Sequence, residues 1–132
     1  MRGGVILVDG DVGLDVGLAM RRGLTAVGGR LGRGAGRGMV AGSIFGFGPV
    51  DRAAGSGMKR GTLAFLGLDE PELLPTFEPS GHLRPHFLTI YLRELRALGF
   101  PVPEAAFSSP IRRYNGDRVV GGIGEVLVVG HP

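Results

Sequence analysis

The segment MRGGVILV at residues 1–8 begins a pattern that recurs as MRRGLTAV at 20–27, MVAGSIFG at 39–46 and MKRGTLAF at 58–65. All four methionines of the chain therefore lie nineteen residues apart. Glycine follows each methionine at the third and ninth positions, which gives two repeated sets: Gly4, Gly23, Gly42 and Gly61, then Gly10, Gly29, Gly48 and Gly67. A fixed period of this length indicates a stack of equivalent coils.

Each repeat contains a short apolar run between glycines, and these runs predict strands rather than helices. They lie at Val5–Val8, Leu24–Val27, Ser43–Phe47 and Thr62–Leu66. A strand that returns at a fixed interval, with no helix between its copies, can pair in register with the copy one coil away. We therefore expect a mainly β fold, a parallel β-helix with nineteen-residue coils over residues 1–67. Leucine-rich repeats and hexapeptide β-helices fit less well, because the first need a recurring Asn or Cys and the second a period divisible by six.

Residues of equal phase should form ladders. One ladder is Ile6, Thr25, Ile44 and Leu63, and the methionines form another that we expect to point inward. The repeated glycines are expected where the backbone needs positive φ or where coils approach too closely for a Cβ. Asp11 shares its phase with Arg30, and Asp15 should lie near Arg33, so weak exposed ion pairs are expected between coils.

The repeat loses its phase after Gly67, and residues 68–132 read as an extension packed on the same domain. Residues 74–81 predict an extended loop with two prolines. Apolar residues at helical spacing predict an amphipathic helix over about 85–98, followed by the stop signal of Gly99 and Pro101. We expect this helix to close the open end of the stack or one of its sides. Residues 101–110 predict a second loop, and residues 111–130 return to glycine-rich strand character that ends in a strand at 126–129.

Composition excludes several classes of function. The chain has no cysteine, so disulfides and thiolate metal sites are excluded. Residues 1–67 carry a net charge of +5 and residues 68–132 carry −2. The basic half lacks exposed aromatic residues between its arginines, which argues against nucleic acid and favours partner proteins. No apolar run is long enough to span a membrane and no signal peptide is evident, so a cytoplasmic location is the expectation.

Four patterns suggest chemistry and are better explained by structure. Asp9, Asp11 and Asp15 do not recur in the next coil as in calcium-binding β-rolls. His82 and His86 have the spacing of helical zinc ligands, but Pro85 lies between them. The glycine-rich residues 32–38 match no phosphate-binding motif, and Ser108 and Ser109 have no His–Asp pattern beside them. We therefore expect no catalytic, cofactor-binding or metal-binding residues in this chain.

The best functional candidates are interface residues. A loop-borne aromatic residue and a tyrosine beside two arginines are types enriched at protein interfaces. The alternative is that Phe77 and Tyr114 pack against the stack. The candidate set is Thr76, Phe77, Arg112, Arg113, Tyr114 and Asp117.

The repeat resembles the GXGXG domain, a right-handed β-helix found in the large subunit of glutamate synthase and in the C subunit of formylmethanofuran dehydrogenase. The second half is similar to one subgroup, on LLPTF at 73–77, LRALG at 95–99, RYNGD at 113–117 and GEVLV at 124–128. That subgroup is the C subunit of the bacterial formyltransferase/hydrolase complex. Its members usually have about twice this length, with more sequence before the first coil, so the chain is expected to be a truncated product, a product of a mis-assigned start or a genuinely short form.

The resemblance implies a function in one-carbon metabolism. The complex moves a formyl group from tetrahydromethanopterin to a methanofuran-type carrier and hydrolyses it to formate, and both carriers are expected in partner subunits. Those partners are amidohydrolase-like and formyltransferase subunits, and the C subunit is implied to be a structural scaffold, not catalytic by itself. Alternatives are the C subunit of a molybdenum or tungsten formylmethanofuran dehydrogenase, a detached β-helix domain of a glutamate-synthase-like flavin oxidoreductase, and a stand-alone binder of a small ligand.

Overall fold

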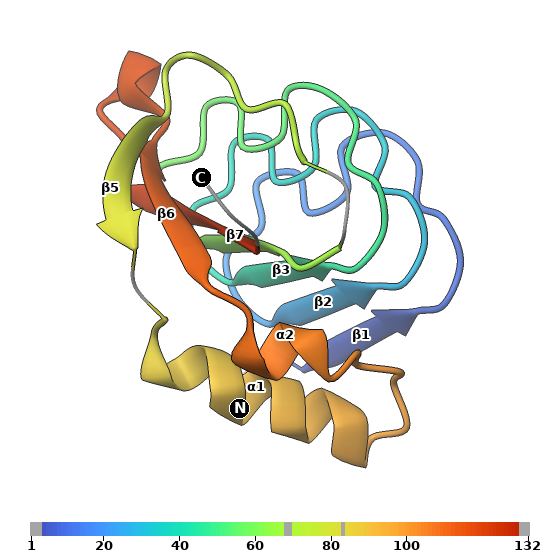
Figure 1. Cartoon of the computed structure of the whole chain (residues 1–132). Coiled ribbons are helices and arrows are strands. Elements are labelled where there is room, and N and C mark those ends of the chain that lie inside the picture. Colours follow the sequence, from blue (N-terminus) through green and yellow to red (C-terminus); the bar gives the residue numbers. More distant parts are fainter. Residues whose placement is uncertain (1–3, 68–69, 83, 130–132) are drawn as a thin grey trace.

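The computed structural model describes residues 4–67, 70–82 and 84–129 and shows a mainly β solenoid with two helices (Figure 1). The predicted solenoid architecture is confirmed. We name residues 4–19, 20–38, 39–57 and 58–67 coils 1 to 4. Each coil contains one strand near its start, and the four are β1 (Val5–Val8), β2 (Leu24–Val27), β3 (Ser43–Gly46) and β4 (Thr62–Phe65).

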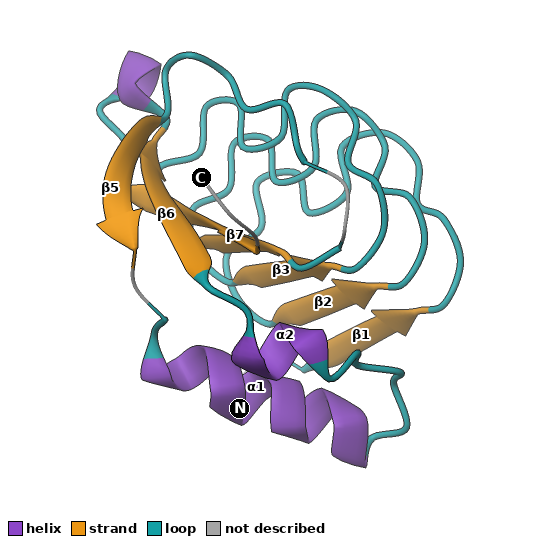
Figure 2. Ribbon diagram, in the orientation of Figure 1, coloured by secondary structure: helices purple, strands orange, loops and turns teal. Residues whose placement is uncertain are grey.

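These four strands are parallel neighbours in one sheet. Val5 pairs with Leu24, Leu24 with Ser43, and Ser43 with Thr62, so residues of equal phase lie side by side. The return segments also touch, through isolated bridges that join Val12 to Leu31 and Leu31 to Val50. The expected side-by-side pairing of the repeated strands is therefore confirmed. Figure 2 shows the return segments as stacked loops beside the row of strands.

The fourth coil is followed in the sheet by strands from the second half of the chain. These are β7 (Gly124–Val129), parallel to β4, then β6 (Ile111–Gly116) and β5 (Glu78–His82), both antiparallel to their neighbours. The strand order is β1-β2-β3-β4-β7-β6-β5. Strand β5 occupies part of the predicted loop 74–81, so that prediction is wrong there. Pro79 and Gly81 gave no strand signal, and pairing with β6 determines the conformation.

Two helices and one short 3₁₀ turn complete the fold. Helix α1 spans His86–Ala97, within the predicted range. Helix α2 (Ala105–Ser108) is a single turn inside the predicted loop 101–110, and η1 (Arg118–Val120) follows β6. Isolated single turns are too short to have a periodic sequence signal, which explains why neither was expected. No helix among the described residues has the length and hydropathy needed to cross a membrane.

Helix α1 covers a flank of the stack, which was one of the two expected positions (Figure 1). Its Leu88, Leu92 and Leu95 are buried in one hydrophobic cluster with strand residues that point away from the solenoid interior. Those strand residues include Leu24, Ala26, Phe45, Ala64 and Leu127. A second cluster fills the solenoid interior and contains Ile44, Leu63 and Val126. The strands are thus buried on both faces over β2–β4, as their continuous apolar sequences require.

The methionine ladder points inward where it can be followed. Met39 and Met58 are fully buried in the interior cluster, and Met20 is half-buried against it. Met1 lies outside the described residues.

The two glycine sets have different physical roles. Gly23, Gly42 and Gly61 have φ of 92°, 94° and 105°, which a residue with a Cβ rarely adopts. Gly29 and Gly48 are not in that region. A Cβ on Gly29 would lie 2.6 Å from the carbonyl carbon of Gly10, and one on Gly48 would overlap the backbone of Gly29. Close approach of successive coils therefore requires glycine here, and positive φ is not the reason.

The expected ion pairs join different partners. The backbone N–H of Arg30 donates to Asp11 at 2.7 Å, but its guanidinium pairs with Asp51 at 2.5 Å. Asp15 lies 3.4 Å from the Nε of Arg37, whereas it meets Arg33 only through a backbone hydrogen bond of 2.9 Å. The predictions of an Asp11–Arg30 and an Asp15–Arg33 side-chain pair are therefore wrong. The long arginine side chains extend to acidic residues of a different phase, so Arg30 pairs with Asp51 and Arg37 pairs with Asp15.

Candidate functional site

The six predicted interface residues gather around β6 and the segment that leads into β5. Arg112, Arg113 and Tyr114 lie on β6, and Asp117 follows its last residue. Thr76 and Phe77 come just before β5, and the backbone N–H of Arg118 donates to the Thr76 carbonyl at 3.1 Å. The structure thus brings the candidates together, but they do not share one environment.

Phe77 belongs to the core. It is 5% exposed and lies in the solenoid interior cluster. Its ring fits between two glycines, since a Cβ on Gly55 or on Gly116 would each lie 2.7 Å from a ring carbon. Of the two roles left open for Phe77, packing against the stack is the one that the contacts show.

Asp117 is a buried carboxylate that ends a backbone ladder. In the coils, the N–H of Ala19 donates to Arg37 and the N–H of Gly38 donates to Ser56, each across to the next coil. The N–H of Gly57 has the same phase, and it donates instead to the Asp117 carboxylate at 2.9 Å. The side chain therefore replaces the carbonyl that a further coil would supply.

The contacts of Asp117 also determine the direction in which its pKa is shifted. Burial alone would raise the pKa of this carboxyl, but hydrogen bonds from Gly57, Thr76 and Val119 hold the pKa below its ordinary value. The Val119 N–H donates at 3.1 Å, which also closes the η1 turn. This role could have been predicted from the sequence. No complete coil follows residue 57, so the Gly57 N–H must find its acceptor outside the repeat.

Arg112 and Tyr114 form a polar cluster with Glu70. The Arg112 guanidinium donates to Glu70 at 2.5 Å and to the Tyr114 hydroxyl at 3.2 Å. The hydrogen bond to Glu70 is the main reason that the pKa of Arg112 is raised. The Arg112 Nε is buried and has no hydrogen-bond partner among the residues that the structure describes.

Arg113 points into a different network. Its Nε donates to Glu125 at 3.0 Å, and Glu125 also accepts from the Thr62 hydroxyl at 3.1 Å. These three residues lie on β6, β7 and β4, so the network ties the second half of the chain to the last coil. An ion pair at this depth orients the strands more than it stabilises them.

A pocket of about 360 Å³ lies beside β5 and β6. Its walls are Pro79, Gly81, His82, Arg112, Arg113 and Tyr114, so three of the predicted interface residues line it. The exposed wall atoms are mostly apolar, although two arginines contribute to the lining. Such a pocket suits the side chain of a docking partner better than a catalytic reaction.

The other patterns from the sequence are separated in the structure. His82 ends β5 and His86 begins α1, both exposed, and Ser108 ends α2. Residues 32–38 form the return turn of coil 2. Within residues 4–67, 70–82 and 84–129, no group of three or more acidic or histidine side chains is placed to hold a metal ion.

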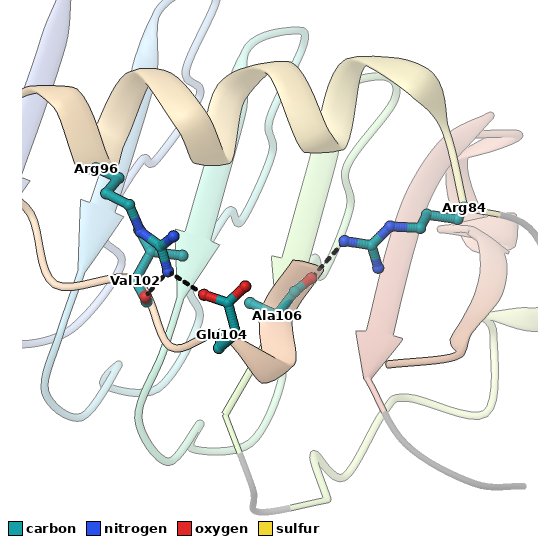
Figure 3. Close-up of polar contacts among 5 residues, drawn as sticks. All are labelled: Arg84, Arg96, Val102, Glu104 and Ala106. Atoms are coloured by element: carbon teal, nitrogen blue, oxygen red, sulfur yellow. Dashed lines mark hydrogen bonds and ion pairs between the residues drawn. The ribbon is translucent and has the colours of Figure 1, made fainter. Parts of the chain in front are cut away.

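Two arginines that the sequence did not single out attach the loop around α2 to helix α1 (Figure 3). Arg84, just before α1, donates to the carbonyls of Ala106 and Ser109 at 2.5 and 3.1 Å. Arg96, in the last turn, donates to the Val102 carbonyl at 2.7 Å and stacks over Phe107 at 4.4 Å. Burial lowers the pKa of Arg84. The contacts of both arginines therefore hold the α2 loop against helix α1.

Comparison with known proteins gives a likeness to a solved structure. Models of protein families give no match, and neither do curated proteins. Among solved structures, the chain is similar to a chain of the formyltransferase/hydrolase complex (FhcABCD) from Methylorubrum extorquens, crystallised with methylofuran. The identity is 26% and the TM-score 0.46, over 96% of this chain and 71% of that chain.

Proposed function

We propose that this protein is the C subunit of a formyltransferase/hydrolase complex, where it serves as a non-catalytic scaffold. The observation that carries the proposal is the match between the sequence segments typical of that subunit and the parts of this fold that complete the solenoid. The RYNGD segment at 113–117 supplies Asp117, and GEVLV at 124–128 lies in the strand that pairs with the last coil.

The chemistry of the described residues fits a scaffold. Strongly shifted pKa values mark catalytic groups when they lie in clefts without a structural partner. Among the residues that the structure describes, the groups with shifted pKa values are Arg84, Arg112 and Asp117, and each shift is explained by contacts that hold the fold together. The ion pair of Arg113 with Glu125 likewise joins two strands and so serves the fold.

The mechanical properties also fit. One sheet runs from β1 through all coils to β5, with a core on each face of its middle strands. Such a body presents flanks of fixed shape to neighbouring subunits. Within this proposal, the coils are the nineteen-residue, right-handed coils of the GXGXG domain, and the formyl carriers bind to the amidohydrolase-like and formyltransferase subunits. The proposal also includes the relation to the C subunit of formylmethanofuran dehydrogenase and a cytoplasmic location.

Co-expression tests the assignment. The chain is produced with the amidohydrolase-like and formyltransferase subunits and purified through a tag on this chain. We expect the subunits to co-purify and to convert formyl-tetrahydromethanopterin to formate, while the isolated chain shows no turnover. The assignment fails if the isolated chain catalyses formyl transfer, or if the chain elutes alone although all subunits are present.

A matched pair of variants tests the candidate surface within that experiment. Tyr114→Ala removes an aromatic wall of the pocket beside β6, whereas Arg33→Ala changes an exposed side chain in the return segment of coil 2, which does not line this pocket. Interface aromatic residues commonly contribute about 2 kcal/mol or more, so we expect retention of the partners to fall about thirtyfold with Tyr114→Ala alone. Equal retention by both variants would remove this pocket from the interface.

A further inference from the structure

A row of four stacked turns lies where the strands of the solenoid begin. Three of them lead into β2, β3 and β4, and the fourth leads into β7 and contains η1, which projects beyond β5 and β6 in Figure 2. The turns are residues 20–22, 39–41, 58–60 and 117–123. Backbone hydrogen bonds of 2.8 Å join each turn to the next, from the N–H of Val40 to Met20, of Lys59 to Met39 and of Ile123 to Lys59. We name these four turns the basic ridge.

The fourth turn exposes three apolar side chains that belong to no core. Val119, Val120 and Ile123 are 74%, 45% and 68% exposed, and neither hydrophobic cluster contains them. Turns that face water usually carry glycine, proline, asparagine, aspartate or serine, whereas β-branched residues favour strands. A single apolar residue on a surface needs no explanation, but three within five positions form a patch that indicates an interaction.

The apolar turn is held in one shape before anything binds to it. The Asp117 carboxylate accepts the Val119 N–H at 3.1 Å, and the Asp117 carbonyl accepts the Gly122 N–H at 2.9 Å. The Arg118 N–H donates to Thr76 at 3.1 Å, which ties the turn to the segment before β5. Because the backbone is already fixed, docking of this patch costs little conformational entropy.

The other turns of the ridge carry positive charge that the described part of the chain does not neutralise. Four cationic side chains are exposed there, and none of them has an ion pair among the described residues: Arg21, Arg22, Lys59 and Arg60. Asp117 is buried, and Arg118 is paired with Glu78. Neighbouring coils lie about 4.8 Å apart, so these cations are within about 15 Å of the apolar patch, a span that one protein interface covers.

Charge and shape together select the kind of partner. Uncompensated cations attract a surface that carries aspartate or glutamate, and a second copy docked through the same ridge would bring like charges together. The ridge has no aromatic residue on which nucleic-acid bases could stack. A single rigid turn also lacks the length of the amphipathic helices that bind lipid surfaces. These observations favour an acidic protein.

We propose that the basic ridge is the docking surface for a partner protein that receives Val119, Val120 and Ile123 in an apolar recess and places aspartate or glutamate side chains against the cationic turns. The inference rests on the proposed function in that the chain works with other subunits. It adds a surface that shares no residue with the pocket beside β6, and it states the chemistry of the partner.

Carbodiimide cross-linking of the co-expressed complex tests the charged contact, because this reagent joins an amine directly to a neighbouring carboxylate. Lys59 is the only lysine of the chain. We expect mass spectrometry to find Lys59 joined to an aspartate or glutamate of a partner subunit. Lys59→Arg keeps the charge, so it should abolish this product and retain the partner. Adding Arg93→Lys, an exposed position on α1, to that variant should not restore a product with the same partner peptide.

Two double variants test the ridge by retention of the partner. Val119→Ser with Ile123→Ser removes most of the apolar patch, and Lys59→Glu with Arg60→Glu reverses two charges. All four positions are exposed, so the fold should be kept, which circular dichroism verifies. Each double variant should weaken retention about tenfold or more. Raising sodium chloride from about 50 to about 500 mM should weaken retention by the wild type about tenfold, but not by the charge-reversed variant. Matched controls on α1, expected to be silent, are Ile90→Ser and Arg93→Glu.

The opposite results overturn the inference in distinguishable ways. A Lys59 product with a second copy of this chain would show that the occupant is a homodimer partner. Binding of the free chain to vesicles of phosphatidylcholine and phosphatidylserine, lost with the charge-reversed variant, would show a lipid surface instead. A complex that retains its partners with both double variants and gives no Lys59 product would refute the docking surface and leave the proposed function standing. Failure of the wild-type chain to form any complex would refute both.

Discussion

Replacing Asp117 tests how the last coil is closed. The carboxylate accepts backbone N–H groups from Gly57 and Val119 and the side-chain hydroxyl of Thr76. In Asp117→Asn, the amide oxygen can still accept from one side, but the amide NH₂ faces a second donor. A hydrogen bond to a charged group contributes about 1.5–3 kcal/mol, so we expect Asp117→Asn to lower the free energy of unfolding at pH 7 by about 2 kcal/mol. Asp117→Ala leaves both backbone donors without acceptors and should cost more.

The pH dependence identifies the carboxylate as the cause. The pKa of Asp117 is lower in the folded protein than its value of about 3.9 in an unfolded chain. Its contribution to stability is therefore complete above the unfolded pKa and is lost as the pH falls through the folded pKa. The difference between wild type and Asp117→Asn, measured by urea unfolding, should be largest at pH 7 and should shrink toward pH 2. A difference below about 0.5 kcal/mol at pH 7, or one that is the same at both pH values, would refute the reasoning.

Three further predictions follow from packing. Gly48→Val should prevent folding at 25 °C, because its side chain would overlap the Gly29 backbone, whereas Gly10→Val has open space and should change the unfolding midpoint little; circular dichroism distinguishes them. Leu92→Ala, at a fully buried position of α1, should cost about 2–5 kcal/mol in urea unfolding, against less than about 0.5 kcal/mol for the exposed Ile90→Ala. Arg33→Ala should be nearly silent in the same assay, since the side chain is exposed and has no ion pair among the described residues. Equal effects within either matched pair, or a large effect at Arg33, would contradict the coil packing.

The repeated part of the fold could be predicted because its information is periodic. Methionine and glycine at constant phase determine which strands are neighbours, and the register Val5 with Leu24 and Leu24 with Ser43 follows from the period alone. Helix α1 was also predictable, since its apolar face recurs over twelve residues and has a clear stop signal. Its place on a flank was not, because both an end and a flank offer apolar surface.

The candidate site was harder for a physical reason. Phe77 and Tyr114 are candidates because their residue types are common at interfaces, and Asp117 because it lies in the same segment as Tyr114, but neither reason determines burial. Phe77 is core because Gly55 and Gly116 make room for its ring, and Asp117 is structural because Gly57 needs an acceptor. Both facts depend on contacts between residues far apart in the chain. The Asp11–Arg30 prediction failed similarly, because equal phase predicts neighbouring backbones but not the reach of a side chain.

One end of the stack of coils is closed by a segment that lies outside the repeat. Segment 117–129 has no repeat phase, yet the Glu125 N–H donates to Gly61 as the Thr62 N–H donates to Gly42, and the Asp117 N–H donates to Met58 as the Lys59 N–H donates to Met39. A segment that completes a coil needs only donors and acceptors at the ladder spacing, apolar side chains over the interior and a matching charge. It does not need the repeat sequence.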